Sequence, residues 1–142
     1  MNELNQTILF LVEKLKEVDY CFIGSASLFI RGAKLNPRDI DILVEEKDFE
    51  GLKTVLTKEI GQEPLIKENK IVYSYQGVEV EAMIAGVDPL RDPGCLQKKE
   101  NVEFSGILAP CMCLPEEILA YQKLGRVDRV EQAENILKNK KT

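Results

Sequence analysis

The run GSASLFIRG at residues 24–32 is followed, after a short loop, by RDIDILV at residues 38–44. The second run is rich in Ile, Leu and Val and predicts a strand. Side chains alternate across a strand, so Asp39 and Asp41 lie on one face while the isoleucines beside them enter the core. Two carboxylates about 7 Å apart along a strand bind hard cations through oxygen, and without a cation they repel each other. The pair therefore predicts a magnesium site.

The dipeptide Gly24-Ser25 lies between a predicted buried strand at 20–23 and a predicted helix at 26–31. Glycine lets another backbone or a ligand approach closely. We expect Ser25 to cap the helix, and the free N–H groups there, with the serine hydroxyl, to hold a phosphate. Each feature alone is more often structural. In this order, a phosphate-binding turn and paired carboxylates indicate transfer from a nucleoside triphosphate.

Periodicity and turn residues predict the other elements. They are helices at 4–18, 49–60, 115–124 and 127–139, a hairpin of strands at 71–75 and 78–84, and a strand at 107–114 with 102–104 paired beside it. This order predicts an α/β (α+β) fold with a mixed sheet flanked by helices. We expect a single domain over residues 1–142, with its core at about 20–114 and a C-terminal helical hairpin at about 115–139.

Composition excludes several classes of function. The 142-residue chain has a net charge of −5, which argues against a long nucleic acid as partner. It has no histidine, so histidine-based nucleophile schemes fall away, and its four cysteines lack the paired spacing of a zinc site. We see no secretory signal and no apolar run near the roughly 20 residues that span a bilayer. We therefore expect a cytoplasmic protein without a membrane partner.

The runs at 24–32 and 38–44 together resemble the signature of the nucleotidyltransferase superfamily, which has the DNA polymerase β-like fold. The segment at 114–128 is similar to the helical end of the small stand-alone members, which include antibiotic-modifying enzymes and the nucleotidyltransferases of toxin–antitoxin pairs. The chain departs from the family pattern at Leu35 and Pro37, where relatives often carry Arg and Thr.

The resemblance implies a third acid on a neighbouring strand, which binds metal or accepts a hydroxyl proton. The strand at 78–84 offers Glu79 and Glu81 on one face. Glu81, in an apolar-Glu-small context, matches the family position better, and we expect Glu79 on a solvated face. The predicted catalytic and metal-binding residues are therefore Asp39, Asp41 and Glu81.

The predicted nucleotide contacts are Gly24, Ser25, Arg38, Lys123 and Arg126. Lys123 and Arg126 lie three residues apart near the junction of the last two helices, where their cations could contact triphosphate oxygens. An ordinary solvated helix face explains these two residues about as well.

We expect a metal-dependent enzyme that moves a nucleoside monophosphate from an NTP, ATP in the first instance, to a hydroxyl on a small molecule or a protein. Mg²⁺ is the expected cofactor, with Mn²⁺ as the alternative. A homodimer or a partner subunit would complete the acceptor site. The alternative is a catalytically weak nucleotide-binding or antitoxin-like interaction module of the same fold. The two differ in whether Glu81 faces Asp39 and Asp41.

Overall fold

The computed structural model describes residues 2–140. Its elements are α1 (Glu3–Lys14), β1 (Tyr20–Ile23), α2 (Gly24–Ile30), β2 (Asp39–Val44), α3 (Glu46–Ile60), β3 (Leu65–Lys67), β4 (Lys70–Tyr75), β5 (Val78–Ile84), η1 (Cys95–Lys98), β6 (Glu100–Phe104), β7 (Ile107–Cys111), α4 (Leu114–Leu124) and α5 (Val127–Lys140). None of the helices in this described part of the chain has both the length and the apolar character needed to cross a membrane.

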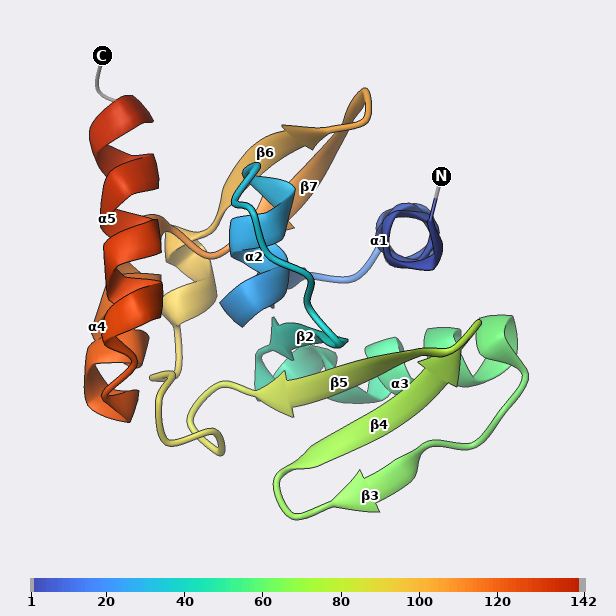
Figure 1. Ribbon diagram of the computed structural model, residues 1–142. Coiled ribbons are helices and arrows are strands. Elements are labelled where there is room, and N and C mark those ends of the chain that lie inside the picture. Colours follow the sequence, from blue (N-terminus) through green and yellow to red (C-terminus); the bar gives the residue numbers. More distant parts are fainter. Residues whose placement is uncertain (1, 141–142) are drawn as a thin grey trace.

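One mixed sheet organises the chain, in the strand order β3-β4-β5-β2-β1-β7-β6 (Figure 1). β2 runs parallel to β5 and antiparallel to β1, and β1 runs parallel to β7. The remaining neighbours pair antiparallel, including the predicted β4–β5 hairpin. This confirms the predicted mixed sheet flanked by helices.

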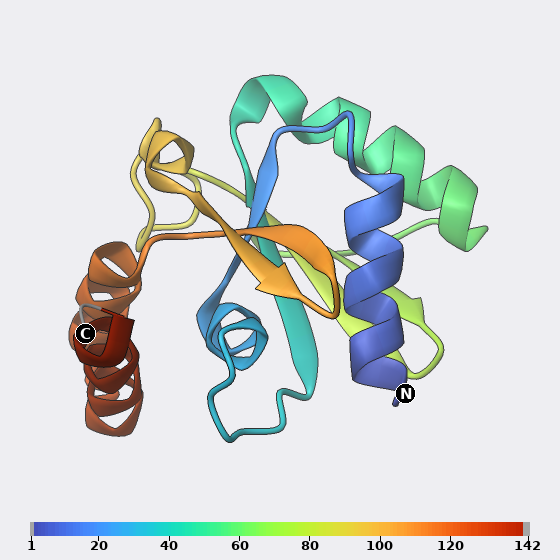
Figure 2. The same ribbon diagram turned by 90° about the horizontal axis from the view of Figure 1, so that it is seen from above.

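The two faces of the sheet have different chemistry because side chains alternate along each strand. Ile40, Ile42 and Val80 are fully buried in a core that also contains Leu11 of α1 and Leu52 of α3. Figure 2 shows α1 and α3 together on one side of the molecule and the α4–α5 hairpin on the opposite side. The acidic residues of β2 and β5 alternate with these buried apolar residues, so the carboxylates face away from the main core.

The C-terminal helices pack against α2 and complete this opposite side. Leu28 of α2, Leu114 and Tyr121 of α4, and Ala133 of α5 form a separate buried cluster. Gly125 joins the two helices in the left-handed conformation, with φ +70°, which a glycine adopts without strain. The predicted C-terminal helical hairpin is confirmed, and it holds α4 beside the end of the sheet that carries the carboxylates.

Several local details differ from the predictions, among them the following. The first helix ends at Lys14 rather than residue 18. The short edge strand β3 was not predicted, because its side chains are all exposed and it pairs with β4 only through its backbone. Ser25 does not cap α2, which begins at Gly24 with Ile23 in the capping position. The Gly24 N–H donates instead to the Glu117 carboxylate, so a distant residue replaces the local cap.

Candidate active site

The candidate site is a cleft of about 320 Å³ where the β1–α2 turn, β2, β4, β5 and α4 meet. Its lining includes Gly24, Ser25, Asp39, Asp41 and Glu81. Cavities of about 480 and 580 Å³ elsewhere are larger. The smaller cleft carries the chemistry, because two members, Asp39 and Glu81, of the only group of three potential metal-ligating side chains found among residues 2–140 line it.

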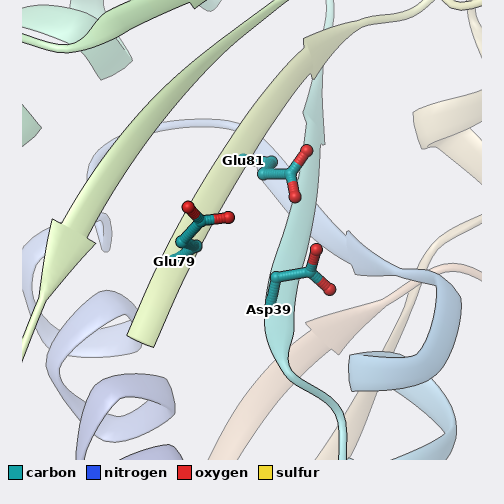
Figure 3. A group of neighbouring side chains, drawn as sticks. All are labelled: Asp39, Glu79 and Glu81. Carbon is teal, nitrogen blue, oxygen red and sulfur yellow. The ribbon is translucent and has the colours of Figure 1, made fainter. Parts of the chain in front are cut away.

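Carboxylates from two parallel strands converge here. The register places Asp39 opposite Glu79 and Asp41 opposite Glu81. Oxygens of Asp39, Glu79 and Glu81 all lie within 4.8 Å of one another (Figure 3). The Asp39 carboxyl group hydrogen-bonds that of Glu81. Glu81 is buried and Glu79 is exposed, as expected for a solvated position, yet the Glu79 carboxylate joins the group.

Asp41 is not one of that group of three and lies beside the turn. It lines the same cleft, and its Oδ2 atom lies 3.4 Å from the point where a Cβ atom on Gly24 would stand. Because Ile23 of β1 pairs with Asp41, the residue that follows Ile23 is brought directly against the Asp41 side chain. The structure thus connects the carboxylate strand to the Gly24-Ser25 turn.

Crowding of like charges perturbs the titration of these groups. The hydrogen bond to Glu81, burial and the Glu81 charge raise the pKa of Asp39 to about 6. Burial and the charges of Asp39 and Glu81 raise the pKa of Asp41 to about 7. Burial opposes ionisation of Glu81, but hydrogen bonds from Asp39 and Lys70 outweigh it and lower the pKa of Glu81. Excess negative charge held this closely favours a bound cation.

Lys70 is a member of the site that the sequence interpretation missed. It lines the cleft and forms an ion pair with Glu81. A usable signal was present in the predicted hairpin. The tight turn pairs Tyr75 with Val78, and that register pairs Val72 with Glu81. Lys70, two residues from Val72, is therefore on the same face as Glu81 and diagonal to it.

The Gly24-Ser25 turn borders the carboxylates, as the sequence suggested, but its donors are not all free. Gly24 has φ +65°, a conformation that side chains disfavour. Its N–H donates to Glu117 Oε1 over 2.9 Å. Ser25 lines the cleft and is partly exposed. Gly24 also lines the cleft, and Ser25 is the residue of this turn that offers a ligand there a side-chain hydroxyl.

Gly24→Val is expected to destabilise the fold by roughly 1–2 kcal/mol and to block nucleotide. The strain comes from the left-handed backbone. The obstruction comes from the γ-methyl groups, since a Cβ alone would make an ordinary contact of 3.4 Å with Asp41. Nucleotide titration and thermal denaturation measure the two effects. Gly51→Val is the matched control, because Gly51 lies within α3 with open space around it. Normal NTP binding by Gly24→Val would leave this turn a purely structural role.

The basic residues predicted to contact nucleotide do not all lie at the cleft. Arg38 is exposed and lines a different hollow, together with Asn36. Lys123 is exposed and is not among the residues that line the cleft. Arg126 lines the cleft, but its guanidinium hydrogen-bonds Asp128 over 3.2 and 3.1 Å. Of these three, only Arg126 therefore lines the cleft.

No protein-family model matches the chain, and no curated protein sequence matches it. Solved structures do match. A protein from Thermotoga maritima assigned as a nucleotidyltransferase is 24% identical, with a TM-score of 0.67 over 94% of this chain and 92% of that one. The lincomycin-bound lincosamide antibiotic adenylyltransferase LnuA is 14% identical, with a TM-score of 0.69 over 96% and 98% of the two chains. A nucleotidyltransferase-like antigenic protein from Paracoccidioides brasiliensis is 22% identical, with a TM-score of 0.64 over 95% and 74%. The chain therefore has the nucleotidyltransferase-like fold.

Proposed function

We propose that this chain is a metal-dependent nucleotidyltransferase that moves a nucleoside monophosphate from an NTP to a hydroxyl group. The observation that carries the proposal is the meeting of Asp39, Asp41 and Glu81, from two parallel strands, beside the Gly24-Ser25 turn. The fold shared with adenylyltransferases supports it.

The chemistry of the donors fits Mg²⁺ or Mn²⁺. These ions prefer oxygen ligands, and carboxylate oxygens of Asp39, Glu79 and Glu81 lie within 4.8 Å of one another. Asp39 and Glu81 of this group would hold the metal together with Asp41, which lines the same cleft and lies opposite Glu81 in the sheet. When bound, the metal would neutralise charge on the phosphates and lower the pKa of an attacking hydroxyl.

In the proposed reaction, the acceptor oxygen forms a bond to the α-phosphorus as the bond from that phosphorus to the bridging oxygen breaks. Pyrophosphate leaves with the electron pair, and the hydroxyl proton passes to a carboxylate. Glu81 would take that proton, since its lowered pKa favours the ionised form and Asp39 and Lys70 hold it in place. Ser25 and Arg126 would contact phosphate oxygens from the walls of the cleft.

We propose ATP as the nucleotide and a small molecule or a protein as the acceptor. One structural neighbour is described with bound lincomycin and another with adenylyl-2″-tobramycin, so small-molecule acceptors are the first class to test. The net charge of −5 disfavours a long nucleic acid. We further propose a cytoplasmic protein that acts as a homodimer or with a partner subunit, which would supply the rest of the acceptor site.

The first test is calorimetric titration with each of the four NTPs, with and without Mg²⁺. We expect saturable binding of at least one NTP that disappears when the metal is chelated. Screening small hydroxyl acceptors for pyrophosphate release then tests transfer. Absence of metal-dependent NTP binding would contradict the proposal. Binding without transfer to any acceptor would favour the interaction module over the enzyme.

A further inference from the structure

Glu117 of α4 is a fully buried carboxylate that hydrogen-bonds the Gly24-Ser25 turn on the side away from solvent. Its side chain is 0% exposed. It is three and four residues from Ala120 and Tyr121, which are also buried, so it belongs to the inward face of the helix. An ionised side chain is rarely buried completely without partners. Its partners therefore indicate its role.

One oxygen of Glu117 holds the Gly24-Ser25 turn. Oε1 accepts the Gly24 N–H over 2.9 Å and lies 3.1 Å from the Ser27 hydroxyl oxygen. The same hydroxyl lies 2.8 Å from the Gly24 carbonyl oxygen. Gly24 is thus hydrogen-bonded through its N–H to a residue 93 positions away along the chain. The single hydroxyl proton of Ser27 lies within reach of both the Gly24 carbonyl oxygen and the same carboxylate.

The other carboxylate oxygen of Glu117 forms an ion pair with a buried arginine. Arg91 Nη2 donates to Oε2 over 2.7 Å, and the Arg91 side chain is only 6% exposed. The loop that carries Arg91 is fixed by its own hydrogen bonds, since the Arg91 carbonyl accepts from Gly86 and its N–H donates to Asp88. The positive charge of Arg91 therefore compensates the buried negative charge of Glu117 next to the turn.

We propose that Glu117 is a positioning residue of the nucleotide site. It would fix the backbone of Gly24 so that Ser25 faces the phosphates and Asp41 keeps its place against the turn. In this proposal Arg91, which also lines the cleft, acts through its ion pair with Glu117. This inference rests on the proposed function, and it gives α4 a role in positioning the nucleotide-binding turn.

Two double variants isolate the acceptor oxygen without leaving a buried charge unpaired. Arg91→Met/Glu117→Gln keeps an amide oxygen that can accept from Gly24 and Ser27. Arg91→Met/Glu117→Leu has similar bulk and no acceptor. We expect the glutamine variant to bind Mg·ATP within about threefold of wild type. The leucine variant should bind about tenfold more weakly or worse, the effect of losing a buried hydrogen bond.

A second measurement needs no nucleotide. Hydrogen exchange at the Gly24 amide, followed by NMR, should be slow in wild type and in the glutamine variant and fast in the leucine variant. Glu100→Gln is the control, because it disrupts the Arg31–Glu100 ion pair, neither member of which lines the cleft. That change should lower thermal stability and leave Mg·ATP affinity unaltered.

Equal Mg·ATP affinity in the two double variants would overturn the proposal, as would equal Gly24 exchange. Affinity lost equally from both, with normal exchange in the glutamine variant, would assign the role to Arg91 itself and also overturn it. A wild-type protein that binds no Mg·NTP would contradict the proposed function. The Gly24 amide would then still decide whether Glu117 holds the turn.

Discussion

Asp41→Asn is expected to abolish Mg²⁺-dependent NTP binding and, at the same time, to make the metal-free protein more stable at pH 8. The loss of affinity should be about 100-fold or more, since even groups that only support metal ligands contribute about 10–100-fold. The gain in stability follows from removing a negative charge that burial, and then the charges of Asp39 and Glu81, disfavour. Asn cannot ionise, so its burial there costs neither the desolvation of a charge nor like-charge repulsion.

The sign of the pH dependence follows from the raised pKa of Asp41. Folding favours its protonated form, so its contribution to stability is complete below the ordinary value of 3.8 and is lost as pH rises through about 7. A shift of this size corresponds to roughly 4 kcal/mol. Solvent screening and relaxation should reduce the measured gain to about 1–3 kcal/mol. Between pH 4 and 8 the metal-free wild type should therefore lose stability that Asp41→Asn retains.

Thermal denaturation in a chelator, from pH 4 to 8, measures this difference, and calorimetry with Mg·ATP measures binding. Asp92→Asn is the control, because Asp92 is exposed and lies outside the cleft. Unchanged Mg²⁺-dependent affinity in Asp41→Asn would remove Asp41 from the metal site. A metal-free variant less stable than wild type at pH 8 would refute the electrostatic account.

Glu81→Gln is expected to lose a factor of about 10²–10⁴ in transfer rate while NTP affinity stays within a few-fold of wild type. Glutamine keeps the shape of the side chain but cannot take a proton. Lys70 loses its anionic partner and the Asp39 carboxyl group loses the carboxylate that it hydrogen-bonds. Because Asp39 and Asp41 remain, and the glutamine amide oxygen can still ligate the metal, the variant should still bind Mg·NTP.

Glu79→Gln provides the comparison, since it removes the other carboxylate on the same face of β5. Glu79 is exposed, and we expect a loss of less than tenfold. Pyrophosphate release with an acceptor found by screening gives the rate, and calorimetry gives the affinity. A larger rate loss in Glu79→Gln than in Glu81→Gln would transfer the role of third carboxylate to Glu79. Equal transfer rates in wild type and Glu81→Gln would show that Glu81 is not the general base.

Local patterns were enough to predict the pieces of the fold. The strands at β1 and β2 begin and end where the sequence predicted, and the β4–β5 hairpin forms around Gln76-Gly77. These features depend on interactions between residues near each other in the chain. Alternation along a strand is local in the same way. The sequence alone could therefore predict that Asp39 and Asp41 lie on one face of β2, and that Glu79 and Glu81 lie on one face of β5.

The basic and supporting residues of the site could not be predicted in the same way. Arg38, Lys123 and Arg126 were chosen for their charge and position in the sequence, and only Arg126 borders the cleft. Lys70 could have been found from the hairpin register. Nothing in the local pattern singles out Glu117, because an acidic residue in the first turn of a helix is ordinary.

By itself, the sequence determined the mixed α/β elements, the paired carboxylates of β2 and the glycine turn before them. Tertiary structure alone decided that β2 pairs in parallel with β5, which brings Glu81 beside Asp41, and that Glu117 lies beneath Gly24. The difference lies in how far apart along the chain the interacting residues are. Periodicity and turn preference arise from neighbouring residues, whereas strand order and helix docking arise from burying surfaces that are distant in the chain.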